Sequence, residues 1–145
     1  MIKHFKFYLV VLLALMIALF SACEDGDDGD DSDDIALLIA ALAEHGITLT
    51  ESDFEGLTME EGAYTNDENG ISGIIHGSVS VSKYESFRDK MDESTTLSAL
   101  TKDTSDTDEV NNFYVTYWKS GGEIIAMILY NGKDIPHITI NYDED

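Results

Sequence analysis

Residues 112–142 read NFYVTYWKSGGEIIAMILYNGKDIPHITINY, and this stretch decides the fold that we predict. Three segments within it, 112–119, 123–130 and 135–142, alternate between apolar and polar side chains with the period of two that is typical of strands. The turn sequences SGG (120–122) and NGKD (131–134) separate the segments. The stretch therefore predicts an antiparallel meander of three strands.

The central segment differs from its neighbours, because IIAMIL at 124–129 is apolar at consecutive positions. Such strands are usually buried on both sides, so we expect both faces of the sheet to be covered here. In the last segment the apolar and polar side chains separate onto opposite faces. The expected inward set is Pro136, Ile138, Ile140 and Tyr142, and the outward set is His137, Thr139 and Asn141.

Before the meander, an Asn69-Gly70 turn predicts a second antiparallel pair of strands. It joins the segment 62–65 to a long strand over 71–82, in which Gly73 is expected to face inward. An inward glycine marks a place where another element packs closely. Together with the meander, this hairpin predicts an antiparallel sheet of about four to six strands.

Residues 83–93 are predicted to form a helix after the strand at 71–82. Ser82 and Glu85 match a capping box, which predicts that the helix begins immediately after Ser82. Tyr84, Phe87 and Met91 recur at helical spacing and should face the sheet.

A further helix is predicted over 35–45, with Asp34 as its N-cap and Gly46 at its end. Its apolar stripe consists of Ile35, Leu38, Ile39 and Leu42. These elements predict one small α+β domain over residues 35–145. Its antiparallel β-sheet ends in a C-terminal three-stranded meander, and one or two helices pack on it.

The composition is strongly acidic. The 145 residues include 29 Asp and Glu but only 8 Lys and Arg, which gives a formal net charge of −21. Nucleic-acid binding depends on Lys and Arg that neutralise phosphates, so we expect no nucleic-acid partner. Cations and basic protein surfaces are the partners that such a charge could attract, and the alternative is that the charge serves only solubility.

Residues 1–22 have the layout of a secretory signal peptide. Lys3 and Lys6 form a basic head, and an apolar run follows over 7–20. As a helix this run would span about 20 Å, which is less than the roughly 30 Å of a bilayer core. The run ends in FSAC (20–23), which resembles the lipobox of bacterial lipoproteins and holds the chain's single cysteine.

The resemblance covers only the leader and this junction. It implies that a signal peptidase cuts between Ala22 and Cys23, that the Cys23 thiol receives a diacylglyceryl group, and that the new amino terminus is acylated, for example with palmitate. Two or more acyl chains anchor a protein stably in a membrane. The acidic segment after Cys23 also resembles the surface-export signal of Bacteroidota lipoproteins. We therefore expect a lipid-anchored protein of the bacterial cell envelope, at the outer membrane or cell surface.

Residues 23–34 consist of Cys23 and the acidic segment EDGDDGDDSDD. This segment has no apolar side chain to bury, so we expect a disordered tether that holds the domain off the membrane. An EF-hand calcium loop is the alternative. Starting from Asp25 or Asp28, however, the required glycine and glutamate are out of place.

No catalytic motif of high specificity is present: there is no G-x-S-x-G elbow, and the single cysteine is expected to be lipidated. His76 and His137 lie on the polar faces of their predicted strands and could converge, which makes them weak candidates for metal ligands. No H-x-H or H-x-x-x-H spacing supports them, and two solvated surface histidines is the competing interpretation. We predict no cofactor.

The aromatic residues of 113–118 fall on two faces of their strand. Tyr114 and Trp118 share one face, and with Tyr130 they could form an exposed platform for a ligand. The alternative is that the helix at 35–45 covers this face.

These observations predict a non-enzymatic protein that acts by binding or as a structural component. Its expected partners are the membrane, through the lipid on Cys23, and an envelope or extracellular protein or a glycan. The alternative is a carbohydrate- or ligand-binding module that uses Tyr114 and Trp118. A third hypothesis is a metal-binding or hydrolytic protein that uses His76 and His137.

Overall fold

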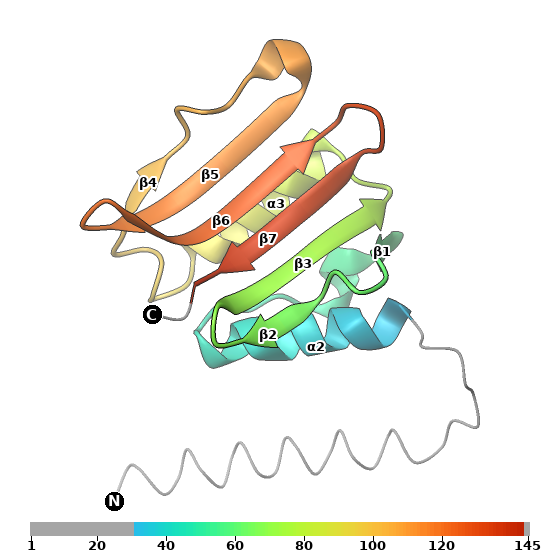
Figure 1. The fold of residues 1–145 in the computed structure, drawn as a ribbon, viewed down its shortest axis with the longest axis horizontal. Helices are drawn as coiled ribbons and strands as arrows, with labels where there is room; N and C mark the ends of the chain where they lie inside the picture. The colour runs from blue at the N-terminus through green and yellow to red at the C-terminus, as the bar shows by residue number, and fades with distance from the viewer. Residues whose placement is uncertain (1–30, 144–145) are drawn as a thin grey trace, which may run out of the picture.

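The computed structural model describes residues 31–143, and these form a seven-stranded antiparallel sheet with helices packed on it (Figure 1). The strands are β1 (Leu57–Met59), β2 (Thr65–Asp67), β3 (Gly70–Gly77), β4 (Thr101–Asp103), β5 (Phe113–Ser120), β6 (Glu123–Asn131) and β7 (His137–Tyr142). Their order across the sheet is β1-β3-β7-β6-β5-β4, and β2 also pairs with β3. The α+β class with a C-terminal meander is confirmed, and the sheet has one strand more than the largest number predicted.

The meander comprises β5, β6 and β7, and its strand bounds agree with the predicted ones to within two residues. The strand β7 begins at His137, directly after Pro136, because a proline has no backbone N–H to contribute to the ladder. In β7 buried and half-buried residues alternate, with Ile138, Ile140 and Tyr142 inward as predicted. Pro136 was also predicted to face inward, and this is wrong: it lies exposed before the strand begins.

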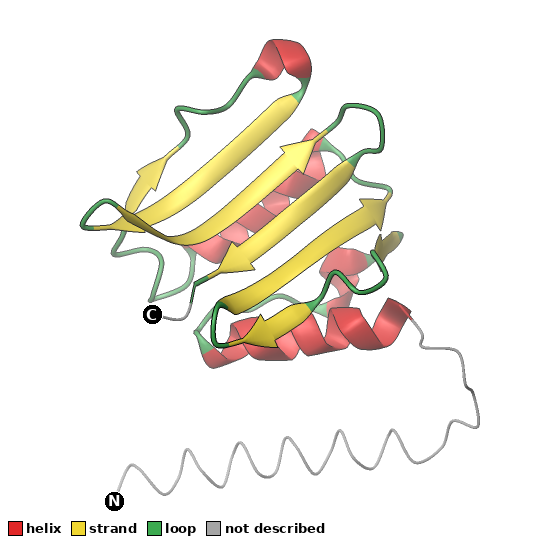
Figure 2. Cartoon of the chain, viewed as in Figure 1, coloured by secondary structure: helices red, strands yellow, loops and turns green. Residues whose placement is uncertain are grey.

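The main core lies between one face of the sheet and the helices α2 (Asp31–Glu44) and α3 (Val81–Asp92). Helix α3 packs on β5 and β6, and α2 packs on β1 and β3, so both cover the same face (Figure 2). From α3, this core receives Tyr84, Phe87 and Met91 as predicted. The largest side chains that the sheet buries completely in this core are Trp118, Ile75, Ile128, Ile138 and Ile140.

Gly73 of β3 lies under α2, as the sequence predicts for an inward glycine. A Cβ atom added there would lie 3.1 Å from Leu38 Cδ2 and 3.2 Å from Met59 Sδ. The absence of a side chain on Gly73 therefore lets α2 approach the sheet closely.

The start of α3 differs from the prediction. Strand β3 ends at Gly77 instead of at Ser82, and the N-cap of α3 is Ser80, whose side chain accepts from Lys83 N at 3.1 Å. The capping box predicted at Ser82 and Glu85 is therefore wrong. The chain leaves the sheet early because Gly77 has φ = +100°, a conformation that ends the strand and that glycine adopts without strain.

Helix α2 also begins earlier than predicted, at Asp31 instead of after Asp34. Asp34 thus lies in the first turn and is not the N-cap. Carboxylates are favourable throughout the first turn because they face the positive end of the helix dipole, so the composition alone does not locate the first residue. The predicted end is confirmed: Gly46 has φ = +80°, and Ile47 N donates to Leu42 O at 3.1 Å.

The other face of the sheet carries no helix in the described part of the chain and faces the viewer in Figure 1. The prediction that both faces of the central strand are covered is therefore wrong. Met127 and Leu129 on this open face are half-buried. Leu129 pairs with Val115 on one side and Thr139 on the other, so neighbouring strands shield it in place of a second layer.

Two short 3-10 helices complete the described chain, η2 (Glu51–Phe54) and η3 (Glu109–Asn111). The Asp53 carboxylate of η2 accepts from Thr50 N at 2.8 Å and from Lys90 Nζ of α3 at 2.6 Å. This ion pair joins the segment that follows α2 to the second helix. Within residues 31–143, no helix combines the length and the apolar composition that crossing a membrane requires.

Candidate functional site

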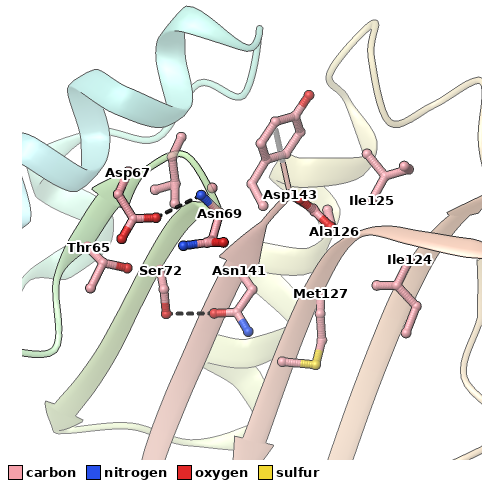
Figure 3. A pocket seen from close by; sticks show the side chains of 13 residues that line it. Thr65, Asp67, Asn69, Ser72, Ile124, Ile125, Ala126, Met127, Asn141 and Asp143 are labelled. Atoms are coloured by element: carbon pink, nitrogen blue, oxygen red, sulfur yellow. Dashed lines mark hydrogen bonds between the residues drawn. The ribbon is translucent and has the colours of Figure 1, made fainter. Parts of the chain in front are cut away.

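A groove of about 460 Å³ lies where β7 ends, between the β2–β3 hairpin and the start of β6 (Figure 3). Its lining combines apolar side chains with hydroxyl, amide and carboxylate groups, which is the usual character of a binding pocket. The residues that line it include Thr65, Asp67, Ser72, Ile124, Met127, Asn141 and Asp143.

The β2–β3 turn forms one wall of the groove. Asp67 Oδ1 accepts from Asn69 N at 2.8 Å, which closes the turn before Gly70. Gly70 has φ = +108°, and a Cβ atom there would lie 2.2 Å from Tyr142 O. Only glycine therefore lets this turn lie directly against the end of β7, and the Asn69-Gly70 pair is the sequence signal for this wall.

Ser72 and Asn141 place polar groups in the groove from paired positions on β3 and β7. Ser72 Oγ donates to Asn141 Oδ1 at 2.7 Å (Figure 3). Because the Asn141 oxygen is the acceptor in this bond, its NH₂ group remains available as a donor. Asn141 was predicted only to point outward, and its pairing with Ser72 needs the sheet order to be known.

The apolar side of the groove depends on a β-bulge. In a regular strand Ile124 and Met127 point to opposite faces, because side chains alternate. Here the register between β5 and β6 shifts at Trp118 and Lys119, which leaves Ile125 without a partner on β5. The bulge brings Ile124 and Met127 into the same groove. Because apolar residues follow one another along this strand, the sequence shows no break in alternation that would indicate the bulge.

Two carboxylates make the groove acidic. Asp67 uses Oδ1 within its turn, so Oδ2 is available to a ligand. Asp143 is exposed, and its backbone N donates to Ile125 O at 2.7 Å, which holds the chain over the start of β6. In a chain with a net charge of −21, these groups favour a cationic ligand.

The predicted aromatic platform is not exposed. Trp118 is 0% exposed, and its Nε1 donates to Asp92 Oδ1 at 2.8 Å at the end of α3. Tyr130 is also buried, and Tyr114 packs between the rings of Tyr84 and Tyr130. The prediction that these residues present a stacking surface is therefore wrong. The helix that covers them is α3, and not the helix at 35–45 that the sequence offered as the alternative.

Phe113 and Tyr117, the other aromatic set of β5, lie half-buried on the open face. Burial raises the pKa of the Tyr117 hydroxyl, and the nearby Asp106 carboxylate raises it further. Alternation along β5 separated the two sets correctly, but the sequence does not indicate which set the helices cover.

His76 and His137 come together, as the sequence suggested they could. Their ring centroids are 5.8 Å apart on the open face, at the end of the sheet opposite the groove. Glu60 lies beside them, with Oε2 3.6 Å from His76 Nε2. Across residues 31–143, however, no group of three or more His, Cys, Asp or Glu side chains could hold a metal ion.

The predicted lipidation and cleavage residues, Cys23 and Ala22, lie outside the described residues, as do the positions considered for a calcium loop at Asp25 and Asp28. Comparisons of this chain with protein-family models, with curated proteins and with solved structures give no match.

Proposed function

We propose that this chain is a lipoprotein of the bacterial cell envelope, anchored by acyl chains on Cys23, whose domain acts by binding and not by catalysis. The leader over 1–22 and its FSAC junction support the anchor. Because α2 begins at Asp31, the segment between the anchor and the folded domain is 24–30. At about 3.3 Å per residue, these seven residues can reach about 23 Å, less than the predicted tether of 23–34 would allow.

The observation that carries the binding proposal is the groove beside the end of β7. It combines an apolar side from Ile124 and Met127 with polar groups from Ser72 and Asn141 and with the carboxylate of Asp67. A pocket with this mixture orients a ligand through a few polar contacts while apolar contacts supply affinity.

The ligand class that fits is a basic segment of an envelope or extracellular protein. A lysine or arginine side chain can lay its aliphatic stem on Ile124 and Met127 while its charged head meets Asp67 and Asp143. Trp118 is buried, and the one aromatic residue that lines the groove, Tyr142, is buried as well, so a carbohydrate in the groove would have no aromatic stacking surface. A basic peptide is therefore favoured over a glycan.

Fluorescence anisotropy tests this proposal, with the full chain in an uncharged detergent and a labelled hexalysine peptide as the probe. The double variant Asp67→Asn/Asp143→Asn should weaken binding about tenfold, because two partly exposed charge contacts contribute roughly 0.7 kcal/mol each. Met127→Lys should abolish binding, because it places a cation inside the groove.

The matched control is Glu51→Gln/Glu93→Gln, which removes two exposed carboxylates outside the groove. It changes the net charge by the same amount and should leave the affinity nearly unchanged. If both double variants lose affinity equally, or if Met127→Lys binds like the original chain, the groove is not the binding site.

The anchor is tested separately by mass spectrometry of the chain recovered from membranes of a bacterial host. We expect an amino terminus at Cys23 that carries a diacylglyceryl group and an N-acyl chain. The Cys23→Ala variant should leave the membrane fraction. Recovery of an unmodified Cys23, or of a chain that still begins at Met1, would contradict the lipoprotein proposal without affecting the groove.

A further inference from the structure

The groove continues onto the open face as one row of side chains that crosses the sheet. Pairing along β3, β7, β6 and β5 places four residues opposite one another in turn: Ser72, Asn141, Met127 and Tyr117. Residues that pair directly across neighbouring strands point to the same face of a sheet. The first three line the groove, and Tyr117 lies one strand beyond it, about 5 Å from Met127.

The surface beyond the groove is apolar. Tyr117 and Met127 are half-buried on the face opposite α2 and α3. Leu129 is diagonal to Tyr117 on the same face and is also half-buried. These three side chains therefore extend the apolar side of the groove across the sheet, within reach of a ligand that the groove holds.

The charges around Tyr117 differ from those in the groove. Lys119 Nζ lies 5.4 Å from the centroid of the Tyr117 ring and donates to Asp103 Oδ2 at 2.5 Å. The attraction of the ring for a cation and the charge of Asp103 are thus both already satisfied by Lys119. Asp106, the other carboxylate near the ring, lies beside the Tyr117 hydroxyl. A second basic side chain over this row would meet the Lys119 ammonium, whereas an uncharged apolar side chain would not.

The spacing fits a segment that crosses the strands in an extended conformation. Side chains on one side of such a segment recur every two residues, about 7 Å apart. With a basic side chain lying on Ile124 and Met127, the next side chain on the same side therefore reaches the surface of Tyr117 and Leu129.

We propose that Tyr117 forms a second contact for the ligand of the groove, and that this ligand is a basic segment with an apolar side chain two positions from its basic residue. The inference rests on the proposed function, because the groove supplies the contact for the basic residue. It adds a requirement on the sequence of the partner. Positive charge brings the segment to the groove, and the apolar residue aligns it across the open face.

Two peptides of equal charge test this requirement by competition with labelled hexalysine, with the full chain in an uncharged detergent. One is Lys-Ser-Leu-Ser-Lys-Ser-Leu-Ser-Lys, and the other has serine in place of both leucines. We expect the leucine peptide to bind about fivefold more tightly, because a leucine side chain is partly buried on the open face. In the Tyr117→Ala variant the two peptides should bind almost equally.

The matched control is Phe113→Ala, which removes another half-buried aromatic side chain from the same face of β5, about 13 Å away at 3.3 Å per residue. It should keep the preference for the leucine peptide. Thermal melts monitored by Trp118 fluorescence establish that each variant is folded. NMR spectra of the unaltered chain need no variant: the leucine peptide should shift the ring protons of Tyr117 and leave those of Phe113 unchanged.

Equal affinity of the two peptides for the original chain would overturn the inference. So would a preference for leucine that persists in folded Tyr117→Ala, or one that Phe113→Ala removes to the same extent. Binding of hexalysine separates this failure from that of the proposed function. If Asp67→Asn/Asp143→Asn weakens hexalysine binding but leucine gives no gain, the groove binds basic segments and only the second contact is wrong. If hexalysine binding does not depend on the groove, both proposals fail.

Discussion

Gly70 shows how a single residue shapes the groove. Its φ of +108° and the 2.2 Å separation between an added Cβ atom and Tyr142 O are two independent obstacles to any side chain. We expect Gly70→Ala to destabilise the domain by about 2–3 kcal/mol, because it adds a backbone clash to the conformational strain. Urea denaturation followed by the fluorescence of Trp118 measures this loss.

Gly122→Ala is the matched control for this prediction. Gly122 has φ = +94°, and an added Cβ atom meets nothing within 4 Å. The Gly122→Ala variant therefore has the backbone strain without the clash, and we expect its free energy of unfolding to fall by only about 1 kcal/mol. Equal losses in the two variants would show that Tyr142 does not restrict the turn.

At the scale of elements, the start of α3 depends on its cap. Ser80 accepts from Lys83 N, whereas Ser82 lies exposed within the first turn. We expect Ser80→Ala to cost about 1 kcal/mol and Ser82→Ala to change stability by less than about 0.5 kcal/mol, because alanine favours a helix interior. The same urea experiment distinguishes them, and a larger loss at Ser82 would restore the capping box that the sequence predicts.

At the scale of the whole molecule, stability depends on a balance between local ion pairs and a large net charge. Burial by itself would raise the pKa of the Asp53 carboxyl, but hydrogen bonds from Lys90 and Thr50 outweigh burial and lower it. Bonds from Lys119 and Ser105 lower the pKa of Asp103. These carboxylates join η2 to α3 and β4 to β5.

A carboxyl with a lowered pKa binds fewer protons in the folded state than in the unfolded state. The stabilisation that it gives is complete above the unfolded pKa of about 3.9 and is lost as pH falls through the lower folded value. The net charge of −21 acts in the opposite direction at neutral pH, because self-repulsion destabilises the compact state. Acidification relieves that repulsion as the chain approaches its pI of about 4.1.

We therefore expect the Tm to rise as pH falls from 7 to about 5 and to decrease below about pH 4. Thermal melts monitored by Trp118 fluorescence, with detergent and protein concentration constant, measure this profile. Added NaCl at pH 7 is the control and should also raise the Tm, because salt screens the repulsion. A Tm that falls steadily from pH 7 to 5 would show that local pairs outweigh the net charge throughout.

Much of the fold follows from local patterns. Alternation along 135–142 predicted the inward side chains of β7, and helical spacing predicted the buried face of α3 at Tyr84, Phe87 and Met91. The errors lie at boundaries, where several residues suit the same role. Ser80 and Ser82 both resemble caps, and the aspartates at 31–34 are all favourable in a first helical turn, so tertiary packing selects among them.

The candidate site was predictable only in part, because its components are far apart in the sequence. The Asn69-Gly70 turn was visible, but the groove also requires β7 to lie between β3 and β6 and requires the bulge opposite Trp118 and Lys119. His76 and His137 could be assigned to polar faces. Their separation of 5.8 Å depends on the same pairing of β3 with β7.

By itself, the sequence determined the strands of the meander, the inward face of β7 and the buried stripe of α3, because side-chain periodicity is a local property of the backbone. Only the tertiary structure decided that Trp118 lies in the core while Phe113 and Tyr117 lie on the open face. Alternation divides a strand into two faces but does not indicate which of them a helix will cover. That choice depends on the long-range packing of α2 and α3, which also leaves the opposite face open to a ligand.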